Sequence, residues 1–261
     1  MKNLMIYVHP EHKFVDGWEG EIEKLVKIQL ENDFWKKEDI MLVTNFPYEY
    51  NGVKAIEVGD ECYCAYKPTV SKIYVLIDLF NRGIIKDELY WFHDFDAFQL
   101  EPFEGNPIEG FDMGMTDYGI IGIDRAYNLR PSTGTIFFNN KTKDIFEEWK
   151  KENDRYLTNE EVSLLAMSHK GRYKPLFDRI TKLNITYNFA IRRRNIQLTY
   201  EICDKPIKVI HFHPWDRRTV FYINPRVNNI EAIIEGKNPL GVLITNKLLE
   251  LFKKHKIYDK D

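Results

Sequence analysis

Two carboxylates stand at the end of the apolar stretch Glu88-Leu-Tyr-Trp-Phe-His-Asp-Phe-Asp96. If this stretch is a β-strand, side chains alternate, and Asp94 and Asp96 leave the same face at its end. Mg²⁺ and Mn²⁺ favour oxygen ligands and are commonly shared between one or two carboxylates and substrate phosphates. The spacing therefore predicts a divalent metal that holds a phosphate-bearing substrate. The alternative is a pair of solvated turn aspartates.

A second apolar stretch, Lys208-Val-Ile-His-Phe-His-Pro-Trp215, carries two histidines. We expect a buried strand in which His211 and His213 share one face, and imidazole can complete a Mn²⁺ site begun by carboxylates. His211 is the predicted metal ligand, because it lies deeper in the run, where a rigid backbone and a partner for its other ring nitrogen are easier to provide. His213 is the predicted phosphate or sugar contact. A core or surface histidine pair before a turn is the alternative.

Strands and helices that could position these residues alternate along the first third of the chain. The apolar patterns predict strands at residues 4–8, 40–44 and 53–58 and helices at 21–32 and 70–80. Gly83 is well placed to end the second helix, and strand, helix and strand at the first spacing predict a βαβ unit with parallel pairing. Ligands of open parallel sheets bind at the carboxyl ends of the strands. We therefore expect one crevice to collect four strand-end residues: His9, Asn45, Asp94 and Asp96.

Beyond Asp96 the pattern changes twice. Prolines and glycines interrupt the periodicity from Glu101 to Pro131, which predicts a long functional loop. Further elements are then predicted: a strand at 134–138, a helix through Ile145, Phe146 and Trp149, a helix at 158–167, and a C-terminal helix through Leu248, Leu249 and Phe252.

The segment Thr158-Asn-Glu-Glu161 also fits a capping box. In this motif the Thr158 hydroxyl accepts from the backbone of Glu161, whose carboxylate bonds back to Thr158. Glu161 is therefore the predicted structural residue. Glu160, free of capping, is the better candidate for an acceptor contact or a base.

Length and composition indicate one large globular domain, predicted to span residues 1–261 with 219–261 as a C-terminal helical extension. A net charge of -3 gives no general case for nucleic acid. Three adjacent cations such as Arg192-Arg-Arg194 in an acidic protein more often form a solvated turn, or a site for one anionic acceptor, than a nucleic-acid site. The short apolar run at the amino terminus predicts no signal peptide, and the sequence has no apolar run of the roughly 20 residues that span a bilayer. Because three cysteines make a disulfide framework improbable, we expect a cytoplasmic protein.

The order of these parts resembles a glycosyltransferase of the GT-A fold, distantly a glycogenin-like one. Tyr90-Trp-Phe-His-Asp-Phe-Asp96 is similar to the Asp-x-Asp strand that binds a nucleotide-sugar diphosphate through Mn²⁺ or Mg²⁺ in that superfamily. Ser132-Thr-Gly-Thr-Ile-Phe-Phe-Asn139 resembles a strand near the sugar, and Thr158-Asn-Glu-Glu-Val162 falls where many members carry an acidic helix start beside the acceptor. His211 resembles the late metal-binding histidine. The lysine that follows this histidine in glycogenin-like proteins is missing here.

The resemblance implies an α/β fold with a Rossmann-related, mostly parallel central sheet flanked by helices. It also implies transfer of a sugar from a nucleotide-diphosphate sugar, most often a UDP-sugar, to a hydroxyl of a glycan or other acceptor. Glu160 and Glu161 are candidates for deprotonating that hydroxyl. The implied metal ligands are Asp94, Asp96 and His211, of which Asp96 also counts as catalytic. The expected donor contacts are His9, Thr44, Lys72, Asp94, Asp96 and His213, with the base and ribose near the first three.

Two other functions stay open. One is a non-catalytic nucleotide-sugar or carbohydrate binding module with a degenerate metal site. The other is a metal-dependent phosphohydrolase, because Asp-x-Asp also follows a strand in haloacid-dehalogenase-like enzymes. Those enzymes usually place Thr or Val two residues past the second Asp, where this chain has Phe98.

Overall fold

The structure is a computed structural model that describes residues 1–16, 21–118, 131–190, 196–211 and 246–257. The chain divides into two compact units, each built from several segments. Unit 1 comprises residues 1–13, 36–94 and 104–183, and unit 2 comprises the described parts of residues 14–35, 95–103 and 184–261. Within the described residues, no helix combines the length and apolar character that crossing a membrane requires.

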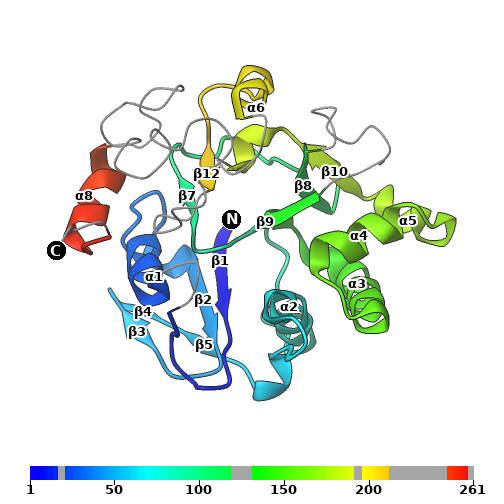
Figure 1. Ribbon diagram of the computed structural model, residues 1–261, viewed down its shortest axis with the longest axis horizontal. Helices are drawn as coiled ribbons and strands as arrows, with labels where there is room; N and C mark the ends of the chain where they lie inside the picture. Colours follow the sequence, from blue (N-terminus) through cyan, green and yellow to red (C-terminus); the bar gives the residue numbers. More distant parts are fainter. Residues whose placement is uncertain (17–20, 119–130, 191–195, 212–245, 258–261) are drawn as a thin grey trace. The chain divides into compact units, whose positions relative to one another are not determined.

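A seven-stranded sheet forms the centre of unit 1 (Figure 1). In spatial order its strands are β10 (Ile180–Leu183), β8 (Met113–Asp117), β9 (Pro131–Phe138), β6 (Tyr90–His93), β1 (Lys2–Tyr7), β2 (Ile40–Thr44) and β5 (Ile56–Glu57). Strand β9 runs antiparallel to its neighbours β6 and β8, and the other neighbouring pairs are parallel. The predicted mostly parallel α/β sheet and the parallel pairing of the first two strands are therefore confirmed.

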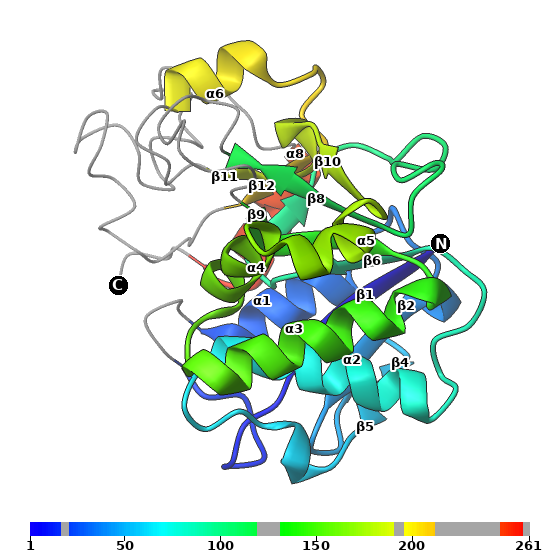
Figure 2. The same ribbon diagram turned by 90° about the vertical axis from the view of Figure 1, so that its right-hand side faces the viewer.

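Helices of unit 1 pack on this sheet through apolar faces. They are α2 (Ser71–Asn81), α3 (Lys143–Tyr156), α4 (Glu160–Ser168) and the short α5 (Lys174–Phe177), and a hairpin of β3 (Glu49–Tyr50) and β4 (Val53–Lys54) follows β2. Figure 2 shows α2 and α3 side by side, and Ile73 and Phe146 of these helices share one core with Phe92 of β6. Gly83 follows α2 with a φ of 65°, a conformation that favours glycine, so the predicted helix end is confirmed.

Strand β8 is absent from the sequence prediction. We expected a loop from Glu101 to Pro131, but Met113–Asp117 is a fully buried strand between β9 and β10. Its sequence, Met-Gly-Met-Thr-Asp, hides the pattern because both faces are covered and Gly114 interrupts the apolar side chains. The loop prediction is therefore wrong for this segment, and residues 119–130 lie outside the described residues.

Unit 2 contains a small sheet and helices from distant parts of the chain. The elements are β7 (Ala97–Gln99), β11 (Phe189–Ala190), β12 (Val209–His211), α1 (Ile22–Leu30), α6 (Ile196–Ile202) and α8 (Asn246–Lys254). The middle strand β12 is parallel to β11 and antiparallel to β7. Phe98 of β7 meets Phe252 of α8 edge to face, with ring centroids 5.1 Å apart. The Gln29 amide of α1 donates to the carbonyls of Phe95 and Ala97, at 2.9 and 3.0 Å.

Candidate functional site

Asp94, Phe95 and Asp96 form a turn, because β6 ends at His93 and β7 begins at Ala97. The predicted strand through Asp96 is therefore wrong, and alternation along a strand does not set the directions of the two carboxylates. Ladder pairing stops because the chain leaves unit 1 for unit 2 between Asp94 and Phe95. The two carboxylates, separated by one residue in the sequence, thus make their polar contacts in different units.

His93 anchors the start of this turn within unit 1. Its fully buried ring places Nε2 2.7 Å from Asn3 Oδ1 and Nδ1 2.9 Å from the carbonyl oxygen of Asp94. The ring also stacks on Trp91, with centroids 4.0 Å apart. The backbone N–H of Asp94 donates to the Gly134 carbonyl of β9 at 2.9 Å. Both backbone polar groups of Asp94, its N–H and its carbonyl, therefore have buried partners.

The carboxylate of Asp94 is paired with a lysine of α2. Lys72 Nζ lies 3.0 Å from Asp94 Oδ1 and 3.5 Å from Glu160 Oε1, and it donates to the Thr133 carbonyl at 3.4 Å. Burial alone would lower the pKa of Lys72, but the charges of Asp94 and Glu160 raise it above its usual value. Lys72 is therefore a buried cation that balances two carboxylates.

Glu160, in the first turn of α4, is held by two hydroxyl donors and by its ion pair with Lys72. Thr69 Oγ1 donates to Glu160 Oε2 at 2.9 Å, and Thr133 Oγ1 donates to Oε1 at 3.1 Å. Burial would raise the pKa of this carboxyl, but Lys72 and the two hydroxyls lower it. Glu160 is therefore an ionised carboxylate of fixed orientation, only 6% exposed.

Helix α4 begins differently from the predicted capping box. Asn159 is the N-cap, and its side-chain oxygen accepts from the backbone N–H of Val162 at 2.8 Å. Asn is at least as good an N-cap as Thr, so the helix begins one residue later than predicted. The carboxylate of Glu161 accepts instead from the backbone N–H of Thr133, at 3.2 Å. Glu161 supports β9, and its assignment to a capping box with Thr158 is wrong.

A second polar assembly lies within unit 2. His211 Nε2 lies 3.0 Å from Asp96 Oδ1, and His211 Nδ1 lies 3.0 Å from Asn188 Oδ1. Asp96, His211 and Asn188 are all buried. One carboxylate oxygen that faces one imidazole nitrogen is a donor set that suits Mn²⁺ and many other divalent cations. His213 lies outside the described residues.

The predicted residues near the base and ribose follow the first two strands. The backbone N–H of His9 donates to Asn45 Oδ1 at 2.9 Å, and Asn45 Nδ2 donates back to the His9 carbonyl at 3.0 Å. These two strand-end residues therefore lie together, as parallel pairing of β1 and β2 requires. The His9 ring stacks with Tyr7, at 6.2 Å between centroids. Thr44 is fully buried, and its hydroxyl donates to the Phe46 carbonyl.

Several residues of these assemblies were not identified from the sequence. Thr133 lies in the segment that resembles a strand near the sugar, and His93 directly precedes Asp94, so both had a positional signal. Thr69 lies just before the predicted helix at 70–80. Asn188 had no such signal, because it is far in the chain from every predicted ligand.

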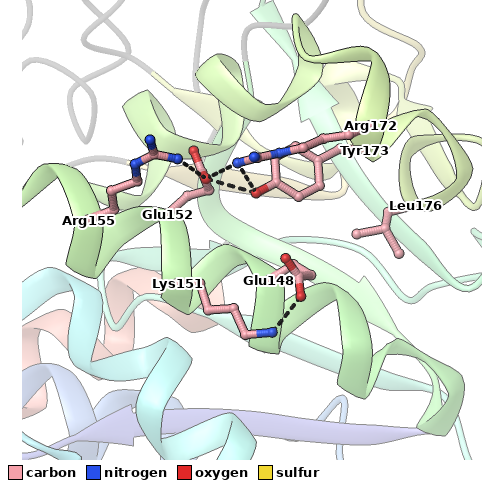
Figure 3. A pocket seen from close by; sticks show the side chains of 7 residues that line it. All are labelled: Glu148, Lys151, Glu152, Arg155, Arg172, Tyr173 and Leu176. Atoms are coloured by element: carbon pink, nitrogen blue, oxygen red, sulfur yellow. Dashed lines mark hydrogen bonds and ion pairs between the residues drawn. The ribbon is translucent and has the colours of Figure 1, made fainter.

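An open hollow of about 460 Å³ on unit 1 is lined by α3, α5 and the 3₁₀ turn Gly171–Tyr173 (Figure 3). At its base the buried Glu152 accepts from Arg172 at 2.6 Å, from the Tyr173 hydroxyl at 2.8 Å, and from Lys170. Arg155 extends toward the same carboxylate, at 3.9 Å. Of the predicted site residues that the structure describes, none lines this hollow. Arg155, Lys170 and Arg172 thus converge on Glu152, and the cluster links α3 to the turn that follows α4.

The fold places the chain among α/β proteins with open, mostly parallel sheets, whose ligands bind at the carboxyl ends of the strands. No protein-family model and no curated protein matches the sequence. Solved structures do match.

An active-site variant of the galactosyltransferase LgtC is 13% identical with a TM-score of 0.55, and the match covers 87% of this chain and 93% of that one. The glycosyltransferase GlyE of Streptococcus pneumoniae TIGR4 is 13% identical with a TM-score of 0.52, over 99% of this chain and 65% of that one. The chain therefore has the GT-A fold of these glycosyltransferases, which confirms the fold that the sequence resemblance implied.

Proposed function

We propose that the protein is a metal-dependent glycosyltransferase that moves a sugar from a nucleotide-diphosphate donor, a UDP-sugar, to a hydroxyl of a glycan or other acceptor. The buried pair of Asp96 and His211 on a GT-A fold carries the proposal. A carboxylate oxygen and an imidazole nitrogen fit Mn²⁺, and Mg²⁺ would rely on the carboxylates. Asp94, two residues from Asp96 in the chain, is the proposed third ligand.

Asp94, Asp96 and His211 would hold the metal. When bound, it would supply positive charge to the diphosphate leaving group. Lys72, beside Asp94 in unit 1, is a fixed cation suited to the phosphate and sugar end of the donor. His9 and Thr44 are the proposed neighbours of the base and ribose, and His213 is the proposed phosphate or sugar contact.

Glu160 is the proposed catalytic carboxylate. Its lowered pKa makes it a weak base, since general bases work best with a pKa near the operating pH. A buried anion of fixed orientation is better suited to stabilising the positive character that develops on the transferred sugar. Glu161, whose carboxylate binds the backbone of Thr133, is the second candidate and the more structural one. A cytoplasmic location stays a prediction.

The test measures binding and transfer separately. Melting temperatures of the native protein are recorded with UDP-, GDP- and dTDP-sugars, each with and without Mn²⁺, because a ligand of the native state raises apparent stability. We expect a Mn²⁺-dependent rise with a UDP-sugar, and sugar transfer or slow donor hydrolysis under the same conditions. Binding without either reaction would favour the non-catalytic module.

The Asp96→Ala variant tests the site itself. It should lose Mn²⁺-dependent nucleotide binding while keeping its circular dichroism spectrum. Asp178→Ala is the matched control, because Asp178 is exposed and pairs with Lys174. Unchanged Mn²⁺-dependent affinity in Asp96→Ala would exclude Asp96 as a ligand.

A further inference from the structure

His211 has a second buried partner that points away from Asp96. Its Nε2 faces Asp96 Oδ1 and its Nδ1 faces Asn188 Oδ1, both at 3.0 Å. Asn188 is fully buried and directly precedes β11, and its backbone N–H donates to the Ile185 carbonyl at 2.9 Å. The parallel register of β11 and β12 pairs Ala190 with His211. Sheet pairing therefore fixes the backbone on both sides of the Asn188–His211 contact.

The contact with Asn188 decides which ring nitrogen of His211 is available to bind a metal. A carboxamide oxygen only accepts hydrogen bonds, so the ring nitrogen that faces it must carry the proton. The Asp96 carboxylate oxygen also only accepts, so Nε2 faces an acceptor as well. A divalent cation bound between Nε2 and Asp96 would take the place of a proton there, and the neutral ring would then carry its proton on Nδ1, toward Asn188. Histidines that bind metals generally donate their other N–H to an oxygen, and this bond fixes both tautomer and ring orientation.

We infer that Asn188 is the positioning residue of the metal site: it holds His211 as the Nδ1–H tautomer, with Nε2 aimed at a divalent cation beside Asp96. This inference rests on the proposed function, in which Asp96 and His211 bind the metal. Asn188 itself touches neither metal nor substrate. It acts through His211, and its contribution is therefore to metal affinity and ligand geometry.

Two substitutions of similar shape separate this role from simple packing. Asn188→Leu removes the acceptor, and Asn188→Asp keeps an oxygen in its place. Binding of Mn²⁺, alone and with UDP, is measured by the electron paramagnetic resonance signal of the free ion. We expect Asn188→Leu to weaken Mn²⁺ binding by roughly 10- to 100-fold, the usual effect of losing such a partner. Asn188→Asp should bind Mn²⁺ at least as tightly as the native protein, even if its melting temperature falls.

A second readout follows the ligand geometry. Co²⁺ replaces Mn²⁺, and its visible absorption reports the ligand set. We expect Asn188→Asp to keep the native spectrum and Asn188→Leu to change it. A purely structural asparagine would predict equal losses of Mn²⁺ affinity in both variants, and that result would overturn the inference. If the Leu variant does not fold, the Asp variant decides: Mn²⁺ binding weakened tenfold or more would also overturn it.

The His211→Ala variant distinguishes a wrong metal site from a wrong role for Asn188. If Mn²⁺ affinity is unchanged in His211→Ala, the proposed metal site is wrong, and the inference about Asn188 falls with it. If His211→Ala weakens Mn²⁺ binding but Asn188→Leu does not, only the inference about Asn188 is wrong. If His211→Ala and Asn188→Leu both weaken Mn²⁺ binding while Asn188→Asp keeps the native affinity, both proposals are supported.

Discussion

The ammonium of Lys72 lies 3.0 Å from the carboxylate of Asp94, and both belong to unit 1. The same ammonium lies 3.5 Å from Glu160. The negative charge of Asp94, a proposed metal ligand, is thus already balanced by a buried cation. Any cation that binds Asp94 must act against the electrostatic field of this lysine.

Lys72→Met is therefore expected to have opposite effects on two ligands. Without the competing ammonium, the affinity for Mn²⁺ alone should rise by about 10-fold, whereas the affinity for a UDP-sugar with Mn²⁺ should fall. The free energy of unfolding should drop by roughly 3 kcal/mol, because Glu160 is left as a buried unpaired anion. Calorimetric titration and urea unfolding measure these effects. Lys174→Met, at an exposed pair with Asp178, is the control, and weaker Mn²⁺ binding in Lys72→Met would contradict the competition.

Glu160→Gln and Glu161→Gln should differ in activity. Glu160→Gln removes the anion beside Lys72, and we expect turnover to fall by about 100-fold or more with little change in KM. Glu161→Gln keeps an oxygen that can accept from the Thr133 N–H, so its turnover should stay within about threefold of native. Steady-state kinetics measure the difference, with the donor that the melting-temperature panel of nucleotide sugars identifies. Equal losses in the two variants would remove the distinction between them.

Glu152 should make stability depend on pH. Burial would raise the pKa of its carboxyl, but hydrogen bonds from Lys170 and Tyr173 and the charges of Lys170 and Arg172 lower it below the usual value. A carboxyl whose pKa is lowered in the folded state contributes stability above its unfolded pKa, and this contribution is lost as pH falls through the folded pKa.

Glu152→Gln is therefore expected to lower the free energy of unfolding by about 2 kcal/mol near neutral pH. The difference from the native protein should close in acid, and urea unfolding at a series of pH values follows it. Glu148→Gln alters a carboxylate on the same hollow that pairs with Lys151 at the surface, and it should cost at most about 1 kcal/mol. A difference that persists unchanged into acid would argue against the lowered pKa.

Gly114 in β8 is expected to tolerate no side chain. A Cβ atom there would lie 2.4 Å from Cγ2 of Ile108 and 3.1 Å from Cδ2 of Leu183. Gly114→Ala should lower the free energy of unfolding by about 1–3 kcal/mol, the usual cost of overpacking a core. Gly171→Ala is the matched control, because a Cβ at Gly171 meets nothing within 4 Å. Equal melting temperatures for the two variants would show that the sheet adapts to the extra methyl group.

The sequence predicted elements best where one face of a helix or strand is buried. Strand β2 has the predicted bounds, and Gly83 ends α2, because apolar spacing and a left-handed glycine are local signals. Strand β8 escaped prediction because both of its faces are covered, so its residues need not alternate between apolar and polar. A strand of methionine, glycine and threonine carries no pattern of its own.

For the site, the sequence predicted that Asp96 and His211 lie together, but not that Lys72 pairs with Asp94 or that Asn188 faces His211. Asp94 and Asp96 stand out after an aromatic run, yet nothing local indicates that the chain passes from one unit to the other between them. The capping box failed because Asn159 and Thr158 are both good N-caps. Asn188 contacts His211, and Thr133 contacts Glu160, only because tertiary packing brings these residues together. The periodicity of the sequence does not report such contacts.

The turn at residues 94–96 is held by groups other than its carboxylates. The Asp94 N–H binds Gly134, and Gln29 binds the carbonyls of Phe95 and Ala97 on either side of Asp96. Substitution at position 96 therefore changes the proposed metal ligand without removing the bonds that set the path of the backbone. In a diverging lineage, such a turn can lose or exchange its acids one at a time while the fold persists. Variants at the proposed metal ligand Asp96 thus keep the backbone path on which a different set of ligands can be built.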